Sequence, residues 1–383
     1  MVGTLIHILL VVGLPPLLLG VIAKTKAVFA GRVGAPVLQP YYDLIKLWSK
    51  ETLLSGTTTW IFWVGPAVAL AATGVAAFLV PLAGEAAPIS FAGDLILLAY
   101  LLGLGRFFQA CAALDTGSSF EGMGAAREVT FACLAEPVLF FGLLVLAKLS
   151  GTLSLSAMLA GPLSSSWQSS GASLLLVLVS WFVLLLAENA RIPFDDPNTH
   201  LELTMIHEVM VLDHSGPVLG MIHYGAALKL FLFAALIVRV AMPFSLRNAW
   251  LHTGVFVIGM LLLAVFIGVV ESVMARLRLV HVPRLLVAAS VLSAFSFILL
   301  LRRGHVRSLA RSDVGPRALG QFLYAGRQPA ARGHLCRCLP GRFARTYAHL
   351  RARRSRLVAG ALGNCHHRYQ RNRHTRIGVV CDA

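Results

Sequence analysis

Apolar runs separated by short polar segments fill the first 301 residues of this sequence. A helix of about 20 apolar residues crosses a hydrocarbon layer about 30 Å thick. Runs of about this length lie near 4–23, 57–82, 91–114, 129–149, 171–188, 218–242, 250–270 and 284–301. The pattern therefore predicts an all-α integral membrane protein with about eight transmembrane helices.

The composition agrees with this fold class, because 57% of the 383 residues are hydrophobic and only 13% are charged. A soluble domain has about 25% charged residues, so this chain is not a soluble enzyme. No basic residue precedes the first apolar run, whereas Lys24 and Lys26 follow it. We expect this run to be a first transmembrane helix and not a cleaved signal peptide.

The formal net charge of +16 comes entirely from the end of the chain. Residues 302–383 hold 18 Arg, no Lys and only two acids, so residues 1–301 carry 15 basic and 15 acidic side chains. We interpret 302–383 as an Arg-rich tail, disordered or derived from a frameshift, because it has no sustained period and its composition is typical of GC-rich DNA read in a wrong frame. A natural extension and a basic domain are the alternatives. We predict no binding to nucleic acid.

Cysteine and histidine spacing gives no metal site. The tail residues Cys336, Cys338, Cys365, His366 and His367 match no zinc pattern. Cys111 and Cys133 fall in or beside apolar segments and imply no disulfide framework.

Basic residues in the short loops predict the orientation. They gather in the first loop, which includes Lys46 and Lys50, and in the seventh, which includes Arg276 and Arg278, while the second and fourth loops have almost no charge. Because basic loops stay in the cytoplasm, we expect loops 1, 3, 5 and 7 to be cytoplasmic and the N-terminus to lie outside a cell inner (cytoplasmic) membrane.

Arg106, Glu136 and Lys229 lie well inside the predicted spans. An unpaired charge at mid-membrane costs about 2.5–3.5 kcal/mol on insertion scales, so these residues are functional candidates. A buried ion pair that only fixes helix packing is the alternative. Glu128 lies eight residues before Glu136, about 80° away around a helix, and we expect both to face one polar path. Loop three adds Asp115, Glu121 and Arg127 on the same side.

The fifth loop, ENARIPFDDPNTHLELTMIHE at 188–208, gathers much of the remaining charge. Two prolines exclude a helix through RIPFDDP, and Thr199 with Glu202 has the spacing of a capping box that starts a helix running to about His214. Glu202 can thus be a cap, and the two aspartates can be turn formers. The candidate proton-relay and coupling residues of the chain are Arg106, Glu128, Glu136, Glu188, Arg191, Asp195, Asp196, Glu202, Glu208 and Lys229.

Several motifs resemble the complex I subunit 1 family. GRVGAPVLQPYYDLIKLWSKE at 31–51 is similar to its first cytoplasmic amphipathic segment, and AENARIPFDDPNTHLEL to its fifth loop. LDTGSSFEGMGAAREVTF, THLELTMIHEVMVLDHSGP and ALKL resemble more closely the hydrogenase branch, that is, the integral membrane component of formate hydrogenlyase and related group 4 [NiFe] hydrogenases. The resemblance covers about residues 1–301.

This resemblance implies a membrane subunit without a cofactor of its own in a proton-translocating complex. Its implied partners are the [NiFe] hydrogenase large and small subunits, an iron–sulfur subunit and antiporter-like membrane subunits. The resemblance also implies that the carboxylates of loop five transmit the redox-driven rearrangement of charge to Glu136 and Lys229. The quinone-binding branch carries Ser-Glu-Leu-Val and Glu-Tyr-Ser-Gly where this chain has 201–204 LELT and 213–216 DHSG. A quinone-site subunit of an NADH:quinone oxidoreductase and a pure scaffold for a soluble hydrogenase are the alternatives.

Overall fold

The computed structural model describes residues 2–82, 86–160, 163–195, 205–242 and 249–312. Residues 1–310 form one compact unit, and residues 311–383 form a second that lies almost entirely outside the described part. All regular elements of the described residues are helical.

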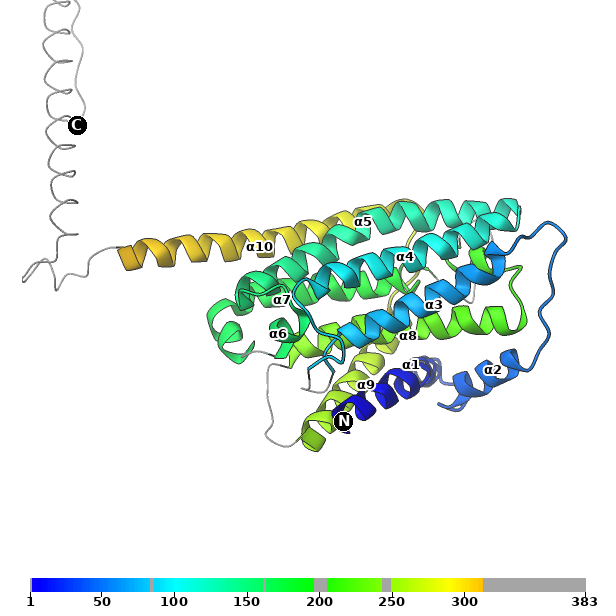
Figure 1. Cartoon of the computed structure of the whole chain (residues 1–383), viewed down its shortest axis with the longest axis horizontal. Coiled ribbons are helices and arrows are strands. Elements are labelled where there is room, and N and C mark those ends of the chain that lie inside the picture. The colour runs from blue at the N-terminus through cyan, green and yellow to red at the C-terminus, as the bar shows by residue number, and fades with distance from the viewer. Residues whose placement is uncertain (1, 83–85, 161–162, 196–204, 243–248, 313–383) are drawn as a thin grey trace, which may run out of the picture. The chain divides into compact units, whose positions relative to one another are not determined.

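In the described part of the chain, eight helices are long and apolar enough to cross a membrane, and Figure 1 shows their arrangement. They are α1 (Val2–Phe29), α3 (Ile61–Leu79), α4 (Asp94–Asp115), α5 (Ser119–Ser150), α7 (Leu163–Glu188), α8 (Gly216–Ala241), α9 (Ala249–Val273) and α10 (Val282–Ser312). The predicted fold class is confirmed, and each predicted span overlaps one of these helices.

The shorter elements are α2 (Gln39–Trp48), α6 (Leu155–Ala160) and the 3₁₀ turns η1 (Glu208–Val211) and η2 (Leu279–His281). α2 follows the first span, begins with Pro40 in its first turn and buries Leu44. The buried carboxylate of Asp94 accepts hydrogen bonds from the Leu155 N–H (2.6 Å) and the Ser154 hydroxyl (3.1 Å), so it fixes the start of α6.

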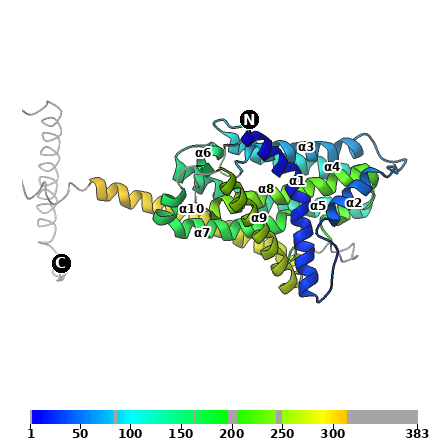
Figure 2. The same ribbon diagram turned by 90° about the horizontal axis from the view of Figure 1, so that it is seen from below.

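Helix α8 is the most buried span and packs against α1, α2, α3, α7 and α9. α3 and α4 lie side by side (Figure 1), and small residues allow their close approach. A Cβ at Gly65 would lie 2.7 Å from the Ala112 Cβ and from the Phe108 carbonyl oxygen. α1 crosses these helices at a steep angle (Figure 2).

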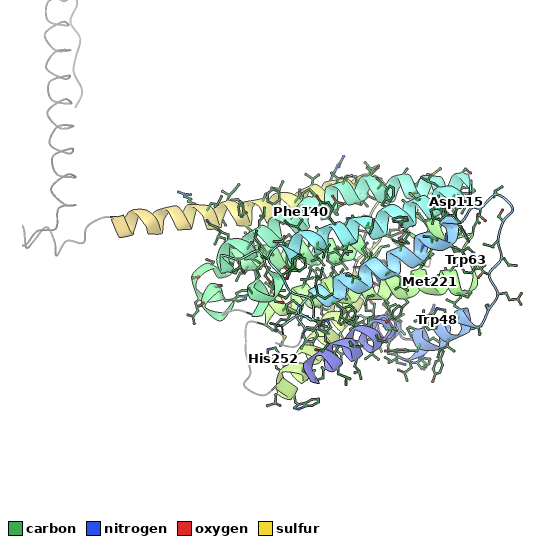
Figure 3. The ribbon with its side chains drawn as sticks, in the orientation of Figure 1. Trp48, Trp63, Asp115, Phe140, Met221 and His252 are labelled. Atoms are coloured by element: carbon green, nitrogen blue, oxygen red, sulfur yellow. The ribbon has the colours of Figure 1, made fainter. Side chains whose placement is uncertain are left out.

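The third loop is much shorter than predicted, because α5 begins at Ser119 and not near residue 129. Two polar side chains of this segment have hydrogen-bond partners in the protein. Glu121 is fully buried and accepts a hydrogen bond from the Asp213 N–H (2.9 Å), and Arg127 donates to the Met205 carbonyl (2.8 Å). Asp115 ends α4 and accepts from the N–H and the hydroxyl of Thr59 (2.7 Å each), beside the start of α3 (Figure 3).

The helix predicted from Thr199 to His214 is wrong in its described part. Residues 205–214 contain only the single 3₁₀ turn η1. The backbone N–H groups of Ile206 and His207 donate to the Asp195 carboxylate (2.9 and 3.1 Å). They are therefore not available for the backbone hydrogen bonds of an α-helix. Thr199, Asp196 and Glu202 lie outside the described residues.

The first loop contacts the start of α8 closely. The Leu53 N–H donates to the Ser215 hydroxyl (3.0 Å), and Gly216 has φ +56° with the Glu51 carbonyl oxygen only 2.6 Å from where a Cβ would lie. At the other end of the chain, α10 continues to Ser312, beyond the expected end at 301. The origin of the Arg-rich tail stays a prediction.

Candidate functional site

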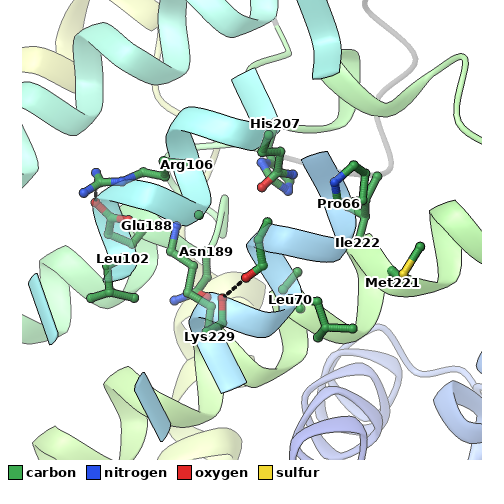
Figure 4. A pocket seen from close by; sticks show the side chains of 16 residues that line it. Pro66, Leu70, Leu102, Arg106, Glu188, Asn189, His207, Met221, Ile222 and Lys229 are labelled. Carbon is green, nitrogen blue, oxygen red and sulfur yellow. Dashed lines mark hydrogen bonds and ion pairs between the residues drawn. The ribbon is translucent and has the colours of Figure 1, made fainter. Parts of the chain in front are cut away.

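Four charged side chains from four helices form a continuous chain of ion pairs. Lys229 of α8 contacts Glu188 at the end of α7 (2.8 Å), Glu188 contacts Arg106 of α4 (3.0 Å), and Arg106 contacts Glu136 of α5 (2.9 Å). Figure 4 shows Arg106, Glu188 and Lys229 around one pocket. We call this set the ionic chain. The sequence predicted all four residues as candidates, and the structure brings them together.

The ionic chain contains two cations and two carboxylates, so it is neutral as a whole. This matters because an unpaired charge in a low-dielectric interior is strongly destabilising. The side chain of Glu188 is 7% exposed and shared by two cations, whereas the side chain of Glu136 is 46% exposed and has one. One end of the chain is therefore buried at α7 and α8, and the other reaches the outer surface of α5.

A cavity of about 60 Å³ borders the buried end. One water needs about 10–15 Å³ on this measure, so the cavity has room for a few waters. Its polar lining includes Arg106, Gln109, Glu188, Asn189 and Lys229, and His207 brings loop five to the same space (Figure 4). Titratable groups joined through water are the arrangement found in membrane proton relays.

Loop five is held by a second set of charges, which we call the anchor cluster: Lys26, Arg191, Asp195, Glu271 and Arg276. Glu271 of α9 contacts Lys26 of α1 (2.9 Å) and Arg191 of loop five (3.5 Å), with its own side chain 1% exposed. Arg191 lies three residues beyond Glu188, after Ala190 with φ +49°. The end of α7 therefore belongs to both sets of charges.

Asp195 is the other fixed point of the anchor cluster. Its buried carboxylate accepts the two backbone hydrogen bonds from 206 and 207 and contacts Arg276 (3.2 Å). The Leu277 N–H also donates to the Pro193 carbonyl (2.9 Å). Asp195 thus joins loop five to loop seven and sets the position of His207 beside the cavity.

Two further predicted candidates lie near these sets without an ion pair in the described residues. Glu128 lies close enough to Arg106 to interact with it electrostatically. Glu208 is half-buried in η1 and interacts electrostatically with His223 of α8. Sharing of one polar path by Glu128 and Glu136 stays a prediction, and Asp196 and Glu202 lie outside the described residues.

Several buried polar residues were not among the candidates from the sequence: one in the anchor cluster and two outside the site. Glu271 was not considered, because the seventh span was predicted to end at residue 270. Arg239, also buried, donates to the Leu159 carbonyl (2.8 Å) toward the far end of α8. His214 stacks on Phe62 with ring centroids 4.2 Å apart, and burial lowers the pKa of its imidazole to about 4.

Comparison with known proteins gives consistent matches. Residues 2–302 match the family described as NADH dehydrogenase. Hydrogenase-4 component C of Escherichia coli (strain K12) is 34% identical over 276 residues, which is 70% of this chain and 86% of that protein. Formate hydrogenlyase subunit 4 of the same strain is 32% identical over 311 residues, 78% of this chain and 97% of that protein. An NADH-quinone oxidoreductase subunit of Paraburkholderia phymatum is 25% identical over 274 residues, 66% of this chain and 75% of that protein.

A solved structure has the same fold. A chain of the membrane-bound sulfane sulfur reductase, described as an archaeal respiratory membrane complex, matches with a TM-score of 0.67 and 21% identity, over 78% of this chain and 98% of that one. The family match and the two relatives above 30% identity extend over most of the chain. This chain therefore belongs to the NADH dehydrogenase family, that is, the complex I subunit 1 family.

Proposed function

We propose that this chain is the membrane subunit of a [NiFe] hydrogenase complex of the formate hydrogenlyase type, and that it relays the redox reaction of a docked peripheral arm to proton (or sodium) movement. The observation that carries the proposal is the ionic chain, which runs from the edge of loop five to the surface of α5. The names of the two relatives above 30% identity, a hydrogenase-4 component and a formate hydrogenlyase subunit, support the kind of complex.

The relay follows from how Glu188 is held. Its two carboxylate oxygens contact different cations, Oε1 to Arg106 and Oε2 to Lys229. A charge change in loop five reaches this carboxylate through His207 and the water-sized cavity. If Glu188 takes up a proton, Arg106 loses one of its two counterions, and its electrostatic attraction to the Glu136 carboxylate becomes stronger. Glu136 is the partly exposed group that exchanges a proton at the far end.

The partners and the orientation belong to the same proposal. Loops 1, 5 and 7 meet at one end of the bundle, where Lys26, Arg191 and Arg276 add positive charge. Basic loops favour the cytoplasmic side of an inner membrane, with the N-terminus outside. The peripheral arm, made of the hydrogenase large and small subunits and an iron–sulfur subunit, docks there, and antiporter-like subunits adjoin the bundle. The chain itself carries no cofactor.

Exchange of one carboxylate tests the relay. Glu136→Gln keeps the size of the side chain and a hydrogen-bond acceptor for Arg106 but removes the titrating group, so we expect an assembled complex that loses most of its coupled activity. The measurements are hydrogen evolution with an added electron donor and proton movement in sealed vesicles, on complexes of verified subunit content. Glu51→Gln is the matched control, because Glu51 is exposed and outside the ionic chain. Full coupled activity in Glu136→Gln would replace the relay with a pure scaffold.

Single-cysteine labelling tests the orientation independently. A reagent that does not cross the membrane, added from the outside, should miss cysteines placed at 196–200 and label those at the exposed positions 165 and 168. The reverse pattern would exclude docking of the arm at loop five.

A further inference from the structure

A second cavity, larger than the one at the ionic chain, lies between α1, α2 and the first half of α8. Its volume is about 500 Å³. Its apolar lining, which we call the floor, consists of Pro16, Leu19, Pro40, Leu44, Leu47, Leu219 and Ala227. Asp43, Lys46, Lys50 and His223 line the rest. A space of this size with an apolar floor and a charged edge fits an amphiphile and not a small soluble ion.

The helices around this cavity are joined where two prolines interrupt the backbone hydrogen bonding of α1. Pro16 has no N–H, so the carbonyl of Val12 has no helical donor. The Tyr224 hydroxyl of α8 donates to this carbonyl (3.2 Å), and the Tyr41 hydroxyl of α2 donates to the carbonyl of Gly13. Both neighbouring helices are therefore tied to α1 at its prolines, and the cavity between them is a built feature of the fold.

The charged edge carries an excess of positive charge. Lys46 lies in the last turn of α2, and Lys50 follows two residues after the helix ends. Both are exposed, and in the described residues neither has a carboxylate within ion-pair distance. Asp43, the acid at the cavity, already accepts a hydrogen bond from the Gln39 amide (2.9 Å). Two cations without a counterion favour an anionic ligand.

Helix α2 also exposes a row of large apolar residues. Tyr42, Ile45 and Trp48 are 59%, 63% and 54% exposed and follow at intervals of three residues. Trp48 also approaches Gly220 at the start of α8 (Figure 3). Aromatic and aliphatic side chains next to lysines on one short helix are typical of a segment at the boundary between acyl chains and headgroups.

We propose that this cavity binds an anionic phospholipid, with its phosphate at Lys46 and Lys50 and one acyl chain along the apolar floor. Basic pockets between transmembrane helices on the cytoplasmic side hold such headgroups. The neutral headgroup of a quinone would leave both lysines without a counterion, so it fits the edge less well. This proposal does not depend on the relay, since none of its residues belongs to the ionic chain.

The test uses the whole complex, reconstituted in nanodiscs of phosphatidylcholine with a minority of phosphatidylglycerol. Native mass spectrometry after gentle detergent release counts the retained phosphatidylglycerol. We expect the double variant Lys46→Gln/Lys50→Gln to retain it more weakly, by roughly fivefold in affinity for each lysine removed. Arg32→Gln/Lys148→Gln is the control, because it removes the same charge at exposed positions away from the cavity, and it should retain the lipid.

Two results would overturn the proposal. One is equal retention of phosphatidylglycerol in both double variants, and the other is a quinone in stoichiometric amount that is lost only from Lys46→Gln/Lys50→Gln. If that variant does not assemble, the wild-type complex decides by exchange between the two lipids. A preference for phosphatidylglycerol supports the site, and equal retention of both lipids refutes it.

Discussion

The ionic chain and the anchor cluster use the same residue types and share the segment 188–191, yet they are built for different tasks. In the ionic chain, Glu188 borders a cavity with room for water, and Glu136 reaches the surface with a single cationic partner. In the anchor cluster, Asp195 is occupied by two backbone N–H groups and an arginine. Burial and the number of fixed donors therefore distinguish a carboxylate that can exchange protons from one that holds the chain in place.

The sharpest test of this comparison is to remove an anchor. Asp195→Ala removes the acceptor of two backbone N–H groups and one contact of Arg276, and loss of one partner of a buried pair costs about 3–5 kcal/mol. We expect poor assembly and rapid proteolysis at loop five, measured as subunit content and protease sensitivity of purified membranes. Complexes that do assemble should keep most of their coupled activity per complex, because Asp195 acts on the relay only by positioning His207 beside the cavity. Normal assembly with lost coupling would place Asp195 in the relay.

Removal of the charge of Glu188, at the centre of the ionic chain, should impair coupling more than assembly. Glu188→Gln keeps the shape of the side chain and an acceptor for Arg106 and Lys229 but not the charge. We expect a less stable but assembled complex whose coupled activity falls by about 10²-fold, the lower limit for loss of a proton-transfer group. Lys229→Met should have a similar effect, and the double variant should be no worse than either single, because both act in one unit. Additive losses would contradict a shared path.

The pH dependence of stability gives a third test, at His214. Its pKa is lowered from 6.5 to about 4 by burial against Phe62, so the unfolded state binds more protons between these values and stability falls as the pH decreases through this window. The loss at pH 5 relative to pH 7.5 is about 2 kcal/mol. His214→Phe should reduce this loss in thermal unfolding of the complex at the two pH values. An unchanged pH dependence would show that His214 does not cause it.

The smallest effect is expected at Asp115. Its carboxylate accepts two hydrogen bonds from Thr59, just before α3, and loss of one hydrogen bond costs about 1 kcal/mol. Asp115→Ala should lower the thermal midpoint slightly without changing coupled activity, and Asp115→Asn should recover part of the loss. An effect on coupling would extend the relay to the third loop.

The sequence allowed prediction of the spans and of the four residues in the ionic chain, because intramembrane charge is costly and stands out in an apolar run. Their order of contact was not predictable, since it joins α4, α5, α7 and α8 in space. The local signal failed at 205–214, where the capping box favoured a helix but the Asp195 side chain takes up the amides. Glu271 was missed because it stands at the end of a span, where a charge is ordinary until its partners from α1 and loop five are known.

The contact between Gly216 and the Glu51 carbonyl has a practical consequence for protein engineering. Any side chain at 216 has to displace the first loop, since that oxygen lies 2.6 Å from the site of a Cβ. The first loop leads back to α2, whereas Gly216 begins the helix that carries Lys229. A purification tag inserted near 51–53 would therefore press on α8 and alter catalytic coupling from a distance, although it touches no charged side chain of the relay.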